Sequence, residues 1–213
     1  LRAYVSVSCN FDQNDNFHVV WAARMVKSGE YYDASKILHW DEVHDTITVV
    51  SHSTGLFEGG WWGWTHPNGF GAWRLPADDP LLSYNPICGR LYCFWCGQAD
   101  TMDVSQGGYP NGDIYGAWSA DGGLTWCNWF NITNTHTPGA AAGACEDEDY
   151  LAVCPYAKRD SFYLTYVEDK DAGAITQTEG DTTNNIVRVL GCICWHGNIE
   201  EIRNNNSNQS LIS

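Results

Sequence analysis

Residues 119–126 read Ser-Ala-Asp-Gly-Gly-Leu-Thr-Trp, and this octapeptide is the most informative stretch of the chain. Asp121 can accept backbone N–H bonds within its own turn, and Gly123 permits a left-handed backbone. The ring of Trp126 can fold under such a turn and plug it. Runs rich in β-formers precede and follow the octapeptide. The pattern therefore predicts a tight hairpin turn between two strands.

Three segments along the chain repeat the order strand, polar turn, strand, and each is rich in β-branched and aromatic residues. No helical period of useful length accompanies them. The sequence therefore predicts an all-β, β-propeller-like fold of about three four-stranded antiparallel blades with long loops. The predicted blades cover residues 1–71, 72–140 and 141–199, and an Asn/Ser-rich flexible tail covers residues 200–213.

Three blades do not close a ring, because propellers have about four to eight blades. The predicted domain is therefore an incomplete ring or part of a larger propeller. Either the remaining blades lie outside this chain or neighbouring subunits complete the stack. The expected partners are thus other copies of the chain or other blades of a longer one.

The charge of the chain excludes some classes of partner. Its 213 residues carry a net charge of −15 and only 11 Lys and Arg. Binding of nucleic acid needs clustered cations, and so does binding to an anionic membrane surface. The longest apolar runs fall short of the ~18 residues of a membrane helix. We therefore expect neither nucleic acid binding nor membrane insertion.

Nine cysteines and eleven tryptophans form a composition typical of extracellular or cell-surface proteins. Cys93 and Cys96 stand three residues apart in a strand pattern, which places their side chains on opposite faces rather than at a zinc site. We expect several buried free thiols with one or two disulfides. Sequons at Asn131, Asn205 and Asn208 permit glycosylation.

The octapeptide has the form Ser-x-Asp-x-Gly-x-Thr-Trp, which resembles the Asp box of sialidase-like β-propellers of secreted bacterial-type proteins. The matching positions are Ser119, Asp121, Gly123, Thr125 and Trp126. In that family the Asp box is a folding element on the outer rim, between the third and fourth strands of a blade. The resemblance therefore implies an architecture and no chemistry.

A second segment, Ala-Trp-Arg-Leu-Pro at residues 72–76, resembles the Phe/Tyr-Arg-Ile-Pro motif of sialidases. The Arg of that motif binds the substrate carboxylate, so the resemblance implies this role for Arg74 if the chain is a glycosidase. A planar guanidinium suits the task because it holds a carboxylate through two bonds. The alternative is that Arg74 pairs a neighbouring acid such as Asp78 or Asp79.

Acidic residues are abundant, but the sequence singles out no catalytic pair. Glycoside hydrolysis needs two carboxylates, or a Tyr nucleophile assisted by a carboxylate, at a fixed separation. The acids of residues 41–42, 78–79, 146–149 and 168–171 are expected to be mostly solvated loop acids. Hard oxygen ligands alternate at Asp12, Asn14 and Asn16, which suits Ca²⁺, although an ordinary Asx-rich turn has the same pattern.

A glycine-rich loop carries Trp61, Trp62 and Trp64. Exposed indole rings on such a loop could stack on sugar rings or contact another subunit. The alternative is a folded-back loop whose tryptophans cap the propeller. These three residues are the predicted contact site.

Three functions are compatible with these observations. The first is a non-catalytic extracellular or cell-surface module for assembly or adhesion, for example in a filament or a larger surface protein. The second is a sialidase-type exo-glycosidase, and the third is a carbohydrate-binding propeller. Fold alone does not separate them, because related folds host unrelated functions.

Overall fold

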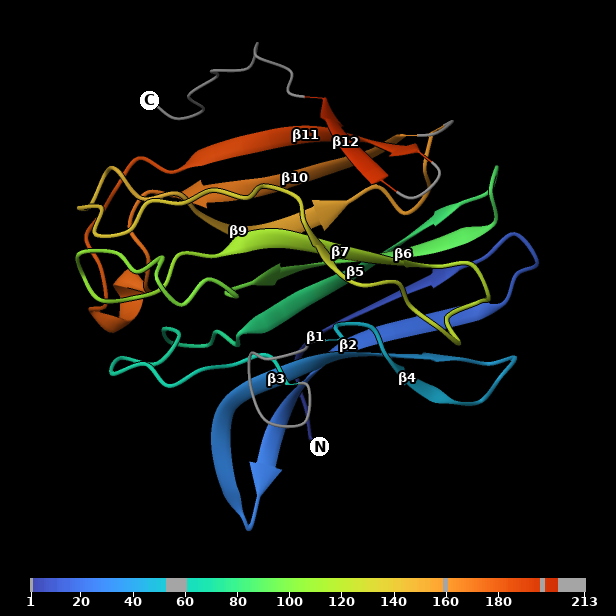
Figure 1. The fold of residues 1–213 in the computed structure, drawn as a ribbon, viewed down its shortest axis with the longest axis horizontal. Coiled ribbons are helices and arrows are strands. Elements are labelled where there is room, and N and C mark those ends of the chain that lie inside the picture. Colours follow the sequence, from blue (N-terminus) through green and yellow to red (C-terminus); the bar gives the residue numbers. More distant parts are fainter. Residues whose placement is uncertain (1, 53–60, 159–160, 196–197, 203–213) are drawn as a thin grey trace.

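The structure is a computed structural model that describes residues 2–52, 61–158, 161–195 and 198–202. Its strands form three antiparallel four-stranded sheets, which we call blades 1, 2 and 3 (Figure 1). Blade 1 contains β1 (Arg2–Phe11), β2 (Phe17–Lys27), β3 (Glu30–Asp41) and β4 (Ile47–Val49). Blade 2 contains β5 (Ala77–Asn85), β6 (Arg90–Gly97), β7 (Asp113–Ser119) and β8 (Phe130–Asn131). Blade 3 contains β9 (Asp147–Val153), β10 (Ser161–Asp169), β11 (Ile186–Trp195) and β12 (Asn198–Ile202).

The predicted fold class is confirmed: the chain is all-β, with three blades in an incomplete propeller ring. The boundaries proposed from the sequence, at residues 71–72 and 140–141, lie in the connections between the sheets. Strand β12 extends to Ile202, across the proposed start of the tail, and residues 203–213 lie outside the described residues. In the described part of the chain the single helix, η1 (Ile175–Gln177), is far too short to cross a membrane.

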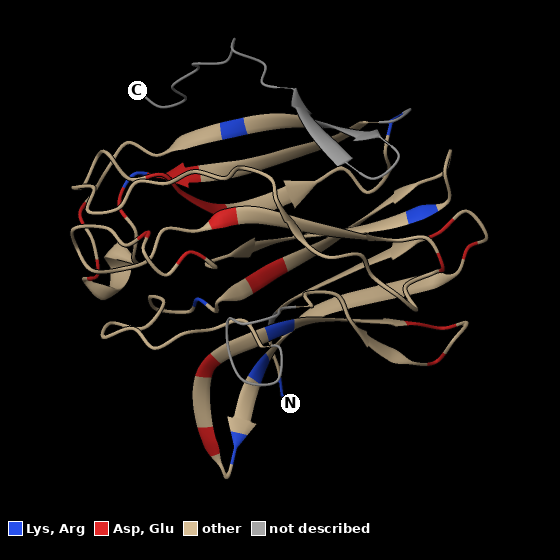
Figure 2. Cartoon of the chain, viewed as in Figure 1, with Lys and Arg blue, Asp and Glu red and all other residues tan. Residues whose placement is uncertain are grey.

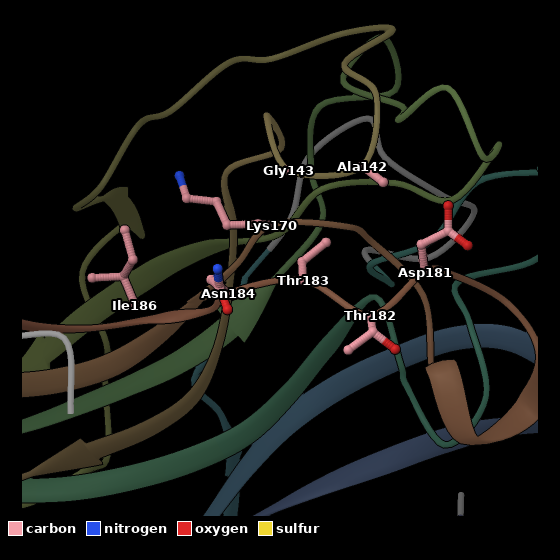
Figure 3. Close-up of a pocket in the computed structure, with 8 residues that line it drawn as sticks. All are labelled: Ala142, Gly143, Lys170, Asp181, Thr182, Thr183, Asn184 and Ile186. Carbon is pink, nitrogen blue, oxygen red and sulfur yellow. The ribbon is translucent and has the colours of Figure 1, made fainter. Parts of the chain in front are cut away.

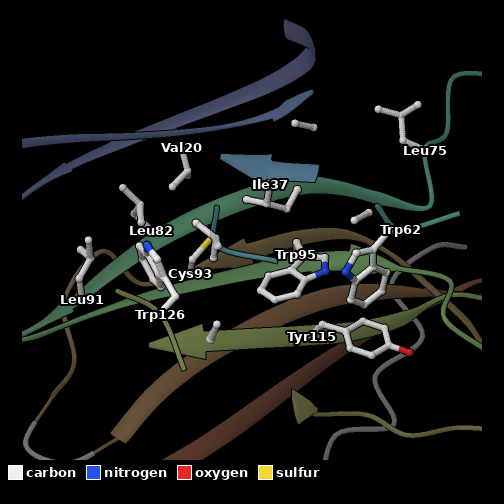
Figure 4. Packing of buried hydrophobic residues seen from close by; sticks show 14 of the residues in the cluster. Val20, Ile37, Trp62, Leu75, Leu82, Leu91, Cys93, Trp95, Tyr115 and Trp126 are labelled. Atoms are coloured by element: carbon white, nitrogen blue, oxygen red, sulfur yellow. The ribbon is translucent and has the colours of Figure 1, made fainter. Parts of the chain in front are cut away.

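The middle blade is buried on both faces by its neighbours. Successive side chains of a strand point to opposite faces. Cys93 and Trp95 of β6 therefore enter the core between blades 1 and 2, while Phe94 and Cys96 pack with Phe162 between blades 2 and 3. The predicted opposite orientation of the two cysteines is thus confirmed. Figure 4 shows the first of these cores, in which each large buried side chain contributes about 1.5–3 kcal/mol.

The outward faces of blades 1 and 3 remain apolar and exposed. Val7 on β1 is 71% exposed and Ile47 on β4 is 60% exposed. On the opposite side of the molecule, Val187 and Val189 of β11 are 58% and 56% exposed. Each of these faces is the surface that a further blade covers in a closed ring.

The cysteines whose side chains the structure describes are all free. They are Cys9, Cys88, Cys93, Cys96, Cys127, Cys145 and Cys154. The expected disulfides are therefore absent from this set, while the side chains of Cys192 and Cys194 lie outside the described part. Packing, rather than covalent cross-linking, holds the described blades together.

The two ends of the blades differ in their connections. Most long loops join strands at one end, on the left in Figure 1, which we call the loop end. It carries residues 50–52, 61–76, 98–112, 132–146 and 170–185. The other end, on the right, which we call the turn end, carries the connections of residues 12–16, 42–46, 86–89 and 120–129.

Candidate functional site

Acidic side chains collect at the loop end, where the first strands of blades 2 and 3 begin. Strands β1 and β5 contact one another, as do β5 and β9, so the first strand of each blade is the innermost. β5 carries Asp78 and Asp79 near its start, and β9 carries Asp147 and Asp149. Figure 2 shows acids at this end of several strands. The topology therefore brings together acids that lie about 70 residues apart in the sequence.

Each innermost strand is distorted at a similar place. Ser6, Asp79 and Tyr150 have φ angles of 67°, 48° and 51°, in the left-handed region. The strand pairing shifts register near each of them, as in a β-bulge. Such bulges re-aim side chains and are frequent beside active sites. At this site the hydroxyl of Ser6 donates a hydrogen bond to the Asp79 carboxylate, which links β1 to β5.

Arg74 is the cation at the centre of this cluster. Its Nη1 and Nη2 lie 2.9 and 3.3 Å from the two carboxylate oxygens of Asp147. Nη1 also lies 3.1 Å from Oδ2 of Asp149. The Gly112 N–H donates to Asp147 at 2.6 Å. The side chain of Arg74 is only 15% exposed, so its fork is already occupied by acids of its own chain.

This geometry supports the expectation that Arg74 pairs an acid, but with different partners from those predicted. Asp147 and Asp149 come from the next blade, whereas the sequence suggested the nearby Asp78 or Asp79. The acidic run at residues 146–149 was the available signal. The expectation that the acids of the four acidic segments are mostly solvated is wrong, because about half of them are buried: Asp41, Asp78, Asp147, Glu148, Glu168 and Asp171. Only the pairing of blades shows why this run is buried.

No arginine triad surrounds Arg74 among the described residues. Arg2 donates to Tyr31, and Arg24 pairs with Asp33. The other described arginines are also engaged elsewhere: Arg90 lies over the Trp118 ring, and Arg188 pairs with Glu168. Arg159 and Arg203 lie outside the described residues. Recognition of a substrate carboxylate by Arg74 therefore has no support in this part of the chain.

Asp79 and Asp149 are the half-buried carboxylates of the cluster. An oxygen of each lies within 4.8 Å of the other and of the Cys96 sulfur. Burial raises the pKa of the Cys96 thiol well above its usual value, so the sulfur stays protonated. The pair is thus formed by two carboxylates from adjacent blades, with Arg74 at its side.

Burial raises the pKa of several acids next to this pair. It raises the pKa of Asp78 to about 7, with a further contribution from the Asp79 charge. Burial also raises the pKa of Asp147, and Arg74 opposes this shift. For Glu148, burial raises the pKa to about 9, so that this side chain is neutral at pH 7. Thr135 donates to one Glu148 oxygen at 3.0 Å, while the other oxygen has no partner.

The three loop tryptophans predicted as a contact site lie in different environments. Trp62 is completely buried and packs edge-on against Trp95, Tyr115 and a third ring, Trp129. Its ring is therefore part of the core and does not face solvent. Trp61 and Trp64 are half-buried. Lys36 Nζ lies 4.8 Å from the centre of the Trp61 ring, and Trp64 donates to the Gln98 carbonyl.

The octapeptide lies at the turn end, between β7 and β8, remote from the acid cluster. Oδ1 of Asp121 accepts the Thr125 N–H at 2.9 Å and the Ser119 hydroxyl at 2.7 Å. Gly123 has a φ of 92°, and the Trp126 indole donates to its carbonyl at 3.0 Å. The turn geometry expected from the sequence is present, and the identity of the motif as an Asp box stays a prediction.

The remaining predicted sites rest on ordinary local contacts. Asp12 accepts backbone N–H bonds from Asn14 and Asn16 at 2.7 and 3.0 Å, which is the Asx-turn alternative to a Ca²⁺ site. Nδ2 of Asn131, the atom that would carry a glycan, donates to Asp113 at 2.7 Å. Asn205 and Asn208 lie outside the described residues.

A surface hollow of about 720 Å³ opens at the loop end of blade 3 (Figure 3). Polar side chains line it, among them Lys170, Asp181 and Asn184. Lys170 is also ion-paired with Glu168 at the end of β10. The hollow therefore adds space and polar groups to the same end as the carboxylate pair.

Comparison with known proteins shows which folds resemble this structure. No protein-family model matches the sequence, and no curated protein matches it. A Hadza microbial sialidase superposes with a TM-score of 0.52 and 13% identity, over 89% of this chain and 35% of that one. An α-L-arabinofuranosidase from Fusarium graminearum has a TM-score of 0.48 and 12% identity, over 89% of this chain and 44% of that one.

An α-L-arabinanase from Penicillium chrysogenum, solved with arabinobiose, has a TM-score of 0.46 and 15% identity, over 93% of this chain and 48% of that one. The chain thus spans about a third to a half of the length of these proteins. At such identities the likeness to the sialidase shows the fold, and the chain is similar in fold to a sialidase-like β-propeller.

Proposed function

We propose that this chain is part of an extracellular, carbohydrate-acting β-propeller whose loop end binds sugar. The observation that carries this proposal is the pair of carboxylates, Asp79 and Asp149, held together by the innermost strands of adjacent blades. The fold is shared with a sialidase, which makes a glycan a plausible ligand. Half-buried acids beside a cation are the groups that glycosidic chemistry uses.

The spacing of the two carboxylates favours one stereochemical course. Their nearest oxygens lie within 4.8 Å. Retaining glycosidases hold their two carboxyl groups about 5–5.5 Å apart, whereas inverting enzymes need roughly 6.5–9.5 Å to admit a water. If the pair cleaves a glycosidic bond, we therefore expect retention of the anomeric configuration.

The surroundings assign different roles to the two acids. Nη1 of Arg74 lies 3.1 Å from Asp149, so a cation stands beside the acid to which we give the role of nucleophile or charge stabiliser. Asp79 has Asp78 beside it, whose pKa of about 7 leaves a proton available near neutral pH. The Asp78–Asp79 side is thus the proton donor in this scheme.

The first test measures hydrolysis and binding with the purified protein. Aryl glycosides of arabinofuranose, xylose and sialic acid are the substrates, and a glycan array reports binding without cleavage. Asp149→Asn and Asp79→Asn are each expected to lower hydrolysis at least ~10²-fold. Asp15→Asn is the matched control because this exposed aspartate lies in the turn of residues 12–16, at the other end of the blades.

Three outcomes separate the candidate functions. Hydrolysis that is lost in both pair variants and kept in the control supports a glycosidase. Binding without hydrolysis supports a carbohydrate-binding propeller. A wild-type protein that neither binds nor hydrolyses any of these glycans would contradict the proposal.

A second candidate, the non-catalytic assembly module, has one observation in its favour. Both outward blade faces expose apolar side chains, including Val7 and Val187. Such faces favour contact with further blades or with another copy of the chain. Light scattering distinguishes these two kinds of partner, because contact with another copy of the chain raises the measured mass.

A further inference from the structure

A cluster of buried histidine and aspartate side chains lies at the turn end of blade 1, far from the acid pair. His18 of β2 and Asp41 of β3 are cross-strand partners, so their side chains share one face of the sheet. His39 stands two residues before Asp41 on the same strand and shares that face. All three are almost completely buried, and one ligand atom from each lies within 4.8 Å of the others.

The two imidazole rings face one another through nitrogen atoms. Nδ1 of His18 lies 3.0 Å from Nε2 of His39. Two nitrogens bound tetrahedrally to zinc at about 2.0–2.1 Å are roughly 3.3 Å apart. The observed separation is therefore close to that of two ligands sharing one ion.

The partners of the remaining ring nitrogens allow these outer nitrogens to carry the protons. Nε2 of His18 faces the Asp12 carboxylate at 3.9 Å, which favours a proton on Nε2. Nδ1 of His39 lies 3.4 Å from the Thr48 hydroxyl oxygen. That hydroxyl donates to the Gly123 carbonyl at 2.7 Å, so it can only accept from His39.

In these tautomers the two facing nitrogens both present lone pairs. These lone pairs lie 3.0 Å apart in a buried site and can both bind one cation placed between them, whereas without a cation one nitrogen carries a proton that bonds to the other. Neutral imidazole is also the form that binds metal ions.

Asp41 completes the donor set and is itself held in place. Its Oδ1 accepts N–H bonds from Val43 at 3.0 Å and from the His44 backbone at 2.9 Å. Nδ1 of the His44 ring lies 2.8 Å from the same oxygen. Ligands of metal ions are commonly oriented by such outer hydrogen bonds.

We propose that His18, His39 and Asp41 bind one divalent transition-metal ion of the zinc type. Two imidazoles and a carboxylate suit zinc, whereas calcium and magnesium prefer oxygen donors throughout. Three protein ligands leave the fourth tetrahedral position to water, and the burial of all three residues keeps the ion away from bulk solvent. The ion would fix the turn end of blade 1 against blade 2, because the His39 ring packs edge-on against Trp126, with ring centres 5.4 Å apart.

The experiment measures zinc binding to protein that has been freed of metal with a chelator. The exposed thiols, Cys9, Cys88 and Cys154, are first alkylated so that they do not bind zinc. Calorimetric titration with Zn²⁺ is expected to give one equivalent. Zinc at 100 times its dissociation constant should raise the folding equilibrium constant about 100-fold.

Variants identify the ligands. His18→Asn and Asp41→Asn should each abolish the bound equivalent and the zinc-dependent rise in thermal midpoint. His136→Asn is the control because His136 is half exposed and, among the residues that the structure describes, pairs with Asp100 and Asp103. No zinc bound by the alkylated wild type, or an unchanged equivalent in His18→Asn, overturns the proposal.

A spectrum of the wild-type protein keeps the test decisive if the variants do not fold. Co²⁺ is added to the alkylated, metal-free protein, and its visible absorption is recorded. Tetrahedral absorption without a thiolate charge-transfer band supports nitrogen and oxygen ligands. A thiolate band would place the ion on a buried cysteine and contradict the proposal.

Discussion

The loop end and the turn end use the same residue type in opposite ways. At the turn end Asp121 is exposed and accepts hydrogen bonds from its own turn. Burial is the largest single effect and raises its pKa, but the hydrogen bonds from Thr125 and Ser119 together outweigh it and lower the pKa overall. At the loop end Asp78 is buried and its pKa rises to about 7. The comparison shows that a turn stabilises the ionised aspartate, whereas the centre of the propeller penalises it.

The largest effect is expected from removing the cation of the loop end. Arg74→Met leaves Asp147 and Asp149 without their charge partner, and Asp147 is fully buried. Breaking a buried ion pair from one side costs about 3–5 kcal/mol of unfolding free energy. Urea denaturation at pH 7 measures this loss.

An exposed pair in blade 1 is the control for this variant. Arg24 lies 2.6 Å from Asp33, whose side chain is 51% exposed. Arg24→Met should change the unfolding free energy by no more than ~1 kcal/mol. Equal losses in the two variants would show that burial does not distinguish the loop end.

The next prediction uses pH to compare the two ends. The folded pKa of Asp78, about 7, exceeds that of the unfolded chain, so stability falls as pH rises from about 4 to 7. Asp78→Asn removes this dependence and should stabilise the protein at pH 8, by up to about 4 kcal/mol. The folded pKa of Asp121 is lowered, so its contribution is present above about pH 4 and is lost at lower pH.

Denaturation of wild type, Asp78→Asn and Asp121→Asn across pH 3 to 8 separates these contributions. The Asp78→Asn difference should grow with rising pH, and the Asp121→Asn difference should shrink as the pH falls below about 4. If the unfolding free energies of the two variants depended on pH in the same way, the aspartates of the two ends would not differ in their electrostatic environment.

The smallest effect concerns the backbone of the turn end. A Cβ on Gly123 would lie 2.0 Å from Cε1 of His39, and the residue has a φ of 92°. Gly123→Ala should therefore cost about 1–3 kcal/mol of unfolding free energy, measured by thermal or urea denaturation. Gly139→Ala is the control, since its φ is 71° but no atom lies within 4 Å of the added carbon.

The difference between the two glycine variants reports the contact across the seam of blades 1 and 2. A cost for Gly139→Ala of about 1 kcal/mol reflects backbone strain alone. If both variants lose the same free energy, the packing of His39 under the turn does not contribute.

Local patterns in the sequence were sufficient to predict part of the structure of this protein. The alternation of β6 predicted that Cys93 and Cys96 point to opposite faces, and the spacing of residues 119–126 predicted the turn hydrogen bonds of Asp121. These features depend on neighbours within a few residues, so strand periodicity and turn chemistry determine them. The tryptophan loop was different, because the burial of Trp62 depends on rings from other strands.

The sequence by itself thus determined the class of fold, the repeated blades and the incomplete ring. Tertiary structure alone decided which side chains meet. Arg74 finds Asp147 and Asp149 in another blade, and His18 meets His39 and Asp41 across a sheet. The physical reason is that strand and turn patterns arise from local geometry, whereas these clusters depend on the register of strands and the stacking of blades.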